Sequence, residues 1–224
     1  SALYRVDHDN GQFSLEGLGD FDCLGDAESM TDLAVDKDGK LFGVSKKNVF
    51  LEMQVSGGTV QCSDKKVALD VAAKVAFYGL TFAPALSNLG TTTETLIGAN
   101  TAGDLYLIDQ SNGSLTLVGR FGNVPADDGH GNKYANAGKA WELSGDIVFL
   151  ASGGSQIGFA TLRDCPNPPS DTGCSTVDTL VEIDATLLKK TSSGSAPIVT
   201  KSVKGLKGMI LRDGCTAGPS SCGF

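Results

Sequence analysis

The chain has 224 residues, enough for one large domain, and 41% of them are hydrophobic, which argues against a disordered protein. Its 29 glycines indicate many turns, and its net charge of -8 argues against a general nucleic-acid binder because an acidic surface repels phosphate. No apolar run approaches the roughly 20 residues that a membrane-spanning helix needs, so no membrane span is expected.

The chain begins with a predicted β-hairpin over residues 3–15, and a similar segment recurs at residues 105–117. Leu, Tyr, Asp, Asn and Gly recur in both segments at the same relative positions. In each segment, apolar residues also alternate with polar ones, which is the pattern of a half-buried strand. The dipeptides Asn10-Gly11 and Asn112-Gly113 lie between the alternating runs. Since Asn-Gly readily adopts the positive φ angles of a tight turn, both segments are predicted hairpins.

A second pattern, two short strands joined by a turn, precedes the hairpins further along the chain. The expected strand pairs are 32–35 with 40–44, 79–82 with 95–99, and 140–143 with 146–150. The hairpin-like segments that follow them are 49–60, 105–118 and 180–203. The sequence therefore predicts three four-stranded units of irregular length.

The two ends of the chain each supply half of such a unit. Residues 208–224 resemble only the first two strands, whereas the N-terminus resembles only the last two. Joining residues 1–19 with residues 205–224 completes a fourth unit and closes a ring, which removes exposed sheet edges. We therefore predict an all-β fold over residues 1–224, a single four-bladed β-propeller domain with one blade shared by both ends. In the alternative, the half-units pair with neighbouring molecules and give a swapped dimer or a filament.

The repeated segments also resemble a known group of proteins. The Leu-Tyr-x-Val/Ile-Asp-x-x-x-Gly hairpins and the run Asp-Lys-Asp-Gly-Lys-Leu-Phe at residues 36–42 resemble blades of secreted bacterial propellers, similar in style to the YVTN and NHL repeat groups. The resemblance covers most of the chain as a blade pattern and implies the fold. Such relatives range from surface and scaffold proteins to lactonases and other hydrolases, so it implies no particular activity and no catalytic residues.

Cysteine content favours an oxidising compartment. The six cysteines are Cys23, Cys62, Cys165, Cys174, Cys215 and Cys222. The last four form two close pairs separated by turn-forming residues, which leaves Cys23 and Cys62 as a third pair, although six cysteines allow other connectivities. Their spacing is unlike that of zinc ligands and the chain has only two histidines. We therefore expect disulfides and a secreted, extracellular or periplasmic location.

One polar loop is a candidate metal site. Asp127, Asp128 and Asn132 place hard oxygen ligands among flexible glycines, which suits Ca2+. The loop lacks the Asp-x-Asp-x-Asp-Gly pattern with a distal glutamate, so a solvated polar loop is the alternative. No other cofactor is expected.

Four side chains at or near the start of the predicted innermost strands can converge on the mouth of a central channel. They are Asp32, Tyr78, Glu142 and Lys207. An aspartate and a glutamate can act as general acid and base if burial separates their pKa values, whereas the alternative is hydrogen bonding between blades. A serine hydrolase is not expected, because the chain has no Gly-x-Ser-x-Gly element.

Two functions follow from these observations. The first is a non-enzymatic extracellular propeller module for surface interaction, adhesion or assembly, which binds a protein or cell-surface partner or a second copy of itself through its terminal strands. The second is a secreted, lactonase-like propeller hydrolase with an acidic or calcium-assisted channel site. Because the sequence has no strong catalytic constellation, the first is preferred and catalytic residues are not assigned.

Overall fold

The computed structural model describes residues 2–25, 28–129, 131–152, 155–170, 172–176, 178–192, 194–201 and 210–211. The fold is all-β, as predicted, and the described residues contain two 3-10 turns, η1 (Ser87–Leu89) and η2 (Ala185–Leu187). The strands of the N-terminal part are β1 (Ala2–Asp9), β2 (Gln12–Phe21), β3 (Met30–Val35), β4 (Leu41–Ser45), β5 (Val49–Ser56) and β6 (Thr59–Ala68). The strands that follow are β7 (Phe77–Ala83), β8 (Thr95–Asn100), β9 (Asp104–Ile108), β10 (Leu115–Arg120), β11 (Trp141–Ser152), β12 (Ser155–Asp164), β13 (Asp178–Ile183), β14 (Thr200–Lys201) and β15 (Ile210–Leu211).

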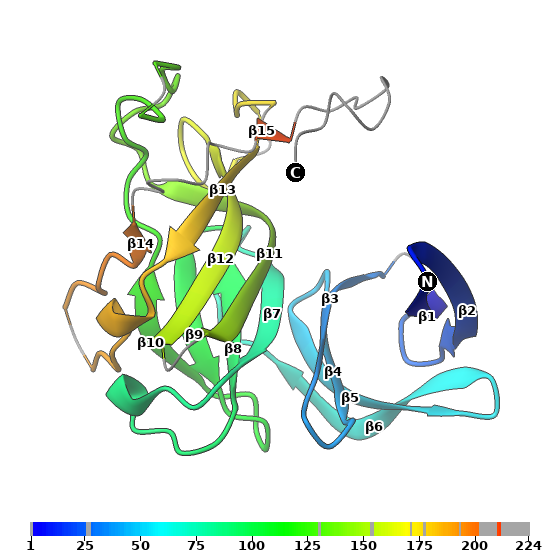
Figure 1. Cartoon of the computed structure of the whole chain (residues 1–224). Helices are drawn as coiled ribbons and strands as arrows, with labels where there is room; N and C mark the ends of the chain where they lie inside the picture. The colour runs from blue at the N-terminus through cyan, green and yellow to red at the C-terminus, as the bar shows by residue number, and fades with distance from the viewer. Residues whose placement is uncertain are drawn as a thin grey trace.

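Three antiparallel meanders of four strands form the body of the molecule (Figure 1). Their orders are β3-β4-β5-β6, β7-β8-β9-β10 and β11-β12-β13-β14. The first two match the predicted units in strand order and approximate bounds.

The third meander differs from the prediction in its strands. Residues 140–143 and 146–150 belong to one long strand, β11, because Ser144 and Gly145 form a bulge where the register shifts between Leu143 and Ile147. Its partner is β12, which the sequence analysis missed, because glycines interrupt the alternating pattern from which a strand is predicted. Strand β13 then pairs with β14 at the predicted 180–203 segment.

Both predicted Asn-Gly hairpins form, but with different turns. In the β1-β2 hairpin, Asn10 and Gly11 have φ angles of 49° and 77°, as the two-residue turn requires. In the β9-β10 hairpin only Gly113 has a positive φ, 70°, and its N–H donates to the carbonyl of Asp109 at 2.7 Å. The second connection is therefore a longer loop.

The apolar core consists of layers between the sheets. Phe42, Val44 and Phe50 of the first meander pack with Phe77 and Leu80 of β7. A second and larger layer lies between the second and third meanders, where Ile97, Leu105, Ile147, Phe149 and Leu162 are buried. The second meander is thus covered on both faces, and β7 contacts β3 on one side and β11 on the other, so the first strands of the three meanders pack together.

The N-terminal hairpin extends the first sheet beyond β6. Asp20 and Phe21 at the end of β2 pair in parallel with Thr59 and Val60 of β6. This sheet has the order β1-β2-β6-β5-β4-β3 and curls, so the hairpin lies well apart from β11–β13 (Figure 1).

The predicted closing blade falls mainly on residues outside the described ranges, including 205–209 and 212–224. The described part, β15, pairs through Ile210 and Leu211 with Thr179 and Asp178 of β13. Closure by residues 1–19 and 205–224 therefore stays a prediction.

Two predicted disulfides are present, Cys23–Cys62 and Cys165–Cys174. The first joins the segment after β2 to β6, and the second closes the loop after β12. Cys215 and Cys222 lie outside the described residues. These bonds are compatible with an extracellular location. No helix in the described parts of the chain is both long enough and apolar enough to cross a membrane.

Candidate functional site

Two carboxyl groups from different sheets influence each other where β3, β7 and β11 pack together. Asp32 belongs to β3, and the negative charge of Asp146 in β11 acts on it. The Oδ1 of Asp32 accepts the N–H of Leu33 at 2.8 Å, and its Oδ2 accepts the N–H of Leu80 in β7 at 2.5 Å. Asp146 accepts the N–H of Ile147 at 2.6 Å. Asp32 of β3 thereby contacts β7 through a hydrogen bond and is influenced by β11 through the charge of Asp146.

The environment of Asp32 favours its protonated form. Burial, followed by the negative charge of Asp146, raises the pKa of Asp32 to about 8. Asp32 therefore keeps its proton to a higher pH than an ordinary aspartate does. A protonated aspartate beside a second carboxyl group can serve as a general acid, which is one of the two roles predicted for the channel carboxylates.

Asp32 is a predicted site residue, but its predicted carboxyl partner is Glu142, and Asp146 is not among the predicted residues. A signal was present, because Asp32-Leu33-Ala34-Val35 and Asp146-Ile147-Val148-Phe149 both place aspartate before three apolar residues. Both aspartates also lie at a register shift, Asp32 directly after the shift in β3 and Asp146 within the shift in β11. The signal was obscured because residues 140–150 were divided into two strands.

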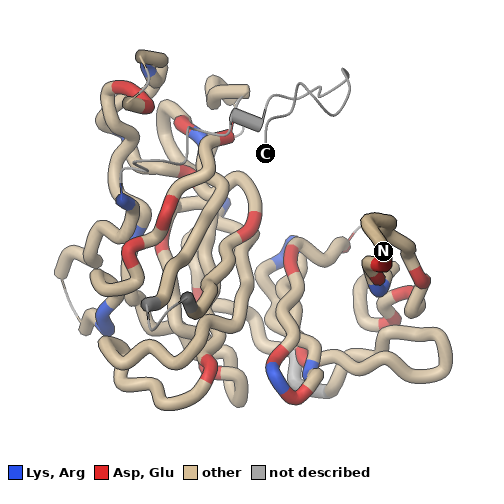
Figure 2. Tube along the Cα trace, in the orientation of Figure 1, with Lys and Arg blue, Asp and Glu red and all other residues tan. Residues whose placement is uncertain are grey.

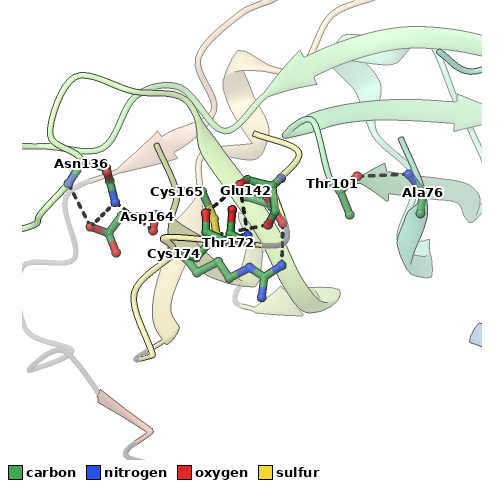
Figure 3. A network of polar contacts seen from close by, with 10 residues as sticks. Ala76, Thr101, Asn136, Glu142, Asp164, Cys165, Thr172 and Cys174 are labelled. Atoms are coloured by element: carbon green, nitrogen blue, oxygen red, sulfur yellow. Dashed lines mark hydrogen bonds and ion pairs between the residues drawn. A yellow bond between two sulfur atoms is a disulfide. The ribbon is translucent and has the colours of Figure 1, made fainter. Parts of the chain in front are cut away.

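Glu142 lies elsewhere, in a buried network at the start of β11. Its carboxylate receives Arg163 Nη2 at 2.6 Å and the N–H of Ser170 at 2.8 Å, and its side chain is only 2% exposed. Figure 3 shows it beside the Cys165–Cys174 disulfide. These contacts bind the disulfide loop to the third sheet, so both oxygens of Glu142 are engaged in structural interactions.

The other two channel candidates are Tyr78 and Lys207. Tyr78 lies at the register shift of β7, and its side chain is exposed. Lys207 lies outside the described residues.

The predicted calcium loop is closed by its own hydrogen bonds. Asp127 accepts the N–H of Gly129 at 2.9 Å, and Asp128 accepts both the backbone N–H and the side-chain amide of Asn132, at 3.1 and 2.8 Å. The three residues are therefore close together, but these oxygens already stabilise a turn. Calcium binding at Asp127, Asp128 and Asn132 stays a prediction.

Clusters of three metal-ligating side chains occur twice in the described ranges. One joins Asp22 to Cys23 and Cys62, and the other joins Glu142 to Cys165 and Cys174. In both, the sulfur atoms are bonded to each other in a disulfide and are not available as thiolate ligands.

A different candidate site is the exposed apolar side of the N-terminal hairpin, which we call the hairpin face. It consists of Tyr4, Val6, Phe13 and Leu15, which are 56%, 60%, 74% and 68% exposed. The register places Val6 opposite Leu15 and His8 opposite Phe13, so these side chains share one side of the hairpin.

The opposite side of the hairpin is polar. Arg5 forms ion pairs with Asp7 at 3.1 Å and with Glu16 at 2.5 Å, and Ser14 lies opposite Asp7. Two-stranded hairpins are marginal in water, and an uncovered apolar side on one indicates a contact surface.

Compared with known proteins, the chain matches no protein-family model, no curated protein and no solved structure. Inference about its function therefore depends on the geometry described above.

Proposed function

We propose that this chain is a non-enzymatic extracellular module that self-associates through its N-terminal hairpin. The observation that carries the proposal is the hairpin face, whose four large apolar side chains are each more than half exposed. Burying such a side chain contributes about 1.5–3 kcal/mol, so covering all four provides a large gross driving force for association. The disulfides support an extracellular setting.

The architecture we propose for this module is a four-bladed propeller of the YVTN or NHL type. The three meanders and their adjacent innermost strands support three blades. The hairpin is half of the fourth, and residues 205–224 are the other half. In an assembling protein, the two halves of this blade come from neighbouring chains.

Light scattering after size-exclusion chromatography tests the proposal on the intact chain. We expect the mass to rise with concentration above that of one chain, and we expect Phe13→Lys to prevent this by placing a charge in the hairpin face. Ser14→Lys is the matched control, because it introduces the same residue one position away, on the polar side of the hairpin. Circular dichroism confirms that both variants keep their strands. A strictly monomeric chain, or equal assembly of Phe13→Lys and Ser14→Lys, contradicts the proposal.

A second candidate is the propeller hydrolase with an acidic channel site, which the Asp32–Asp146 pair favours. It predicts turnover of a chromogenic ester or lactone, lost in both Asp32→Asn and Asp146→Asn while the melting temperature is retained. Metal analysis of the purified protein distinguishes a calcium-assisted site from an acid–base pair acting alone. Turnover that survives both substitutions eliminates this candidate.

A further inference from the structure

We propose that the hairpin face docks on the outer face of β11 and β12 in a second copy of the chain. This inference rests on the proposed function and names the partner surface of the same site. The partner surface, called the β11–β12 face, consists of Val148, Leu150, Ile157 and Phe159.

Within the described ranges, the β11–β12 face is the exposed side of the third sheet. Ile147 and Phe149 point into the layer against the second meander and are 1% and 4% exposed. Val148 and Leu150 alternate with them, so they point the other way, and they are 40% and 51% exposed. Among the described residues, the third sheet thus packs through one side and exposes the other.

Strand β12 widens this uncovered surface. Val148 lies directly opposite Phe159 and Leu150 directly opposite Ile157, and residues paired in this way share a side of the sheet. Both β12 side chains are half-buried. The resulting apolar patch has two residues from each of two antiparallel strands, as the hairpin face does.

Within one chain these two faces are held apart. The base of the hairpin is attached to β6 in three ways. It pairs with β6 as a strand, the Cys23–Cys62 disulfide joins the two, and the N–H of Asp22 donates to the carbonyl of Val60 at 3.0 Å. Strands β6, β5 and β4 separate the hairpin from β3, and β7 lies between β3 and β11. The two faces can therefore meet between copies without breaking these bonds.

Charge also favours a second copy at this place. Each copy carries a net charge of -8, and Asp and Glu are spread along the whole chain (Figure 2), so most approaches of two copies are repulsive. The four residues that define each face are uncharged. Glu182 lies directly opposite Phe159 on the same side of the sheet, but it is paired with Lys201 at 3.3 Å, and the exposed Asp146 lies two residues before Val148.

The geometry is heterologous, because two different surfaces of the same chain make the contact. Two copies that exchange hairpins close a dimer with two such contacts, whereas one-way docking continues into a longer assembly. Either result requires both faces to be intact, and each contact uses one face from each copy.

Mixing two defective variants tests this arrangement by light scattering. Phe13→Lys removes the hairpin face and Val148→Lys removes the β11–β12 face, so we expect each variant alone to be monomeric. Mixed in equal amounts, they retain one good contact between the hairpin of the Val148→Lys chain and the β11–β12 face of the Phe13→Lys chain. We expect the mixture to show the mass of two chains.

Val35→Lys is the matched control, because Val35 is a strand valine that is 58% exposed and lies outside both faces. We expect it to assemble as the unchanged chain does. If Val148→Lys fails to fold by circular dichroism, Val148→Ser replaces it and should weaken assembly at least tenfold.

The results separate the two proposals. If Phe13→Lys is monomeric while folded Val148→Lys and Val148→Ser assemble normally, the hairpin mediates assembly but this partner surface is wrong. If the unchanged chain is monomeric at every concentration, both proposals fail. A monomer whose melting temperature falls in both variants shows instead that the two faces meet within one chain.

Discussion

Replacing Asp32 by asparagine is expected to stabilise the protein increasingly as the pH rises from about 5 to about 8. Asparagine is uncharged at every pH, as the protonated acid is, although it keeps only one of the two oxygens that accept the N–H groups of Leu33 and Leu80. The loss of one acceptor shifts the stability by the same amount at every pH, so the change with pH reports the proton of Asp32. The measurement is the free energy of unfolding by urea at several pH values, for the variant and for the unchanged chain.

The sign follows from the raised pKa of Asp32, about 8 in the folded protein against an ordinary value of about 3.9. Between these values the folded protein keeps a proton that the unfolded chain releases, so stability falls as the pH rises. The stabilising contribution of Asp32 is complete below about pH 4 and is lost as the pH passes through about 8. One proton gives a slope of at most about 1.4 kcal/mol per pH unit, so the gap can widen by up to about 4 kcal/mol over this interval.

Two further variants make this prediction specific to the carboxyl pair. Asp146→Asn removes the neighbouring charge, which should lower the pKa of Asp32 and reduce the slope. Asp70→Asn removes an exposed carboxylate and should leave the slope unchanged. Parallel stability profiles of Asp32→Asn and the unchanged chain would mean that Asp32 does not hold the proton.

Replacing Arg163 by methionine is expected to lower the free energy of unfolding by about 3 kcal/mol. The change leaves the Glu142 carboxylate, 2% exposed, without its counter-ion in an apolar setting. Removing one partner of a buried ion pair costs roughly 3–5 kcal/mol, and we expect the lower end because Arg163 is itself 34% exposed. Chemical denaturation at neutral pH measures the loss.

The double variant Glu142→Gln with Arg163→Met is the control for this interpretation. Because it removes both charges, it should recover more than half of the stability that Arg163→Met loses. Additive losses in the double variant, or a loss below about 1 kcal/mol in Arg163→Met, would show that the ion pair is not what holds the disulfide loop to the sheet.

The sequence by itself determined the all-β class, the first two meanders and the hairpins, because these depend on local physics. Alternation of period two and the positive φ of Asn10 and Gly11 require no knowledge of distant residues. The pairing of Cys23 with Cys62, proposed by elimination, is also confirmed by the structure.

Tertiary structure alone decided the third sheet and the candidate site. A bulge such as Ser144-Gly145 continues one strand only because β12 pairs on both sides of it, and a local pattern cannot distinguish that bulge from a turn. Asp32 and Asp146 are 114 residues apart in sequence and meet only because β3, β7 and β11 pack together, and the burial of Asp32 there raises its pKa. Tertiary structure also decides that the hairpin face is exposed. The same alternating residues would be buried in the core if another sheet packed on them.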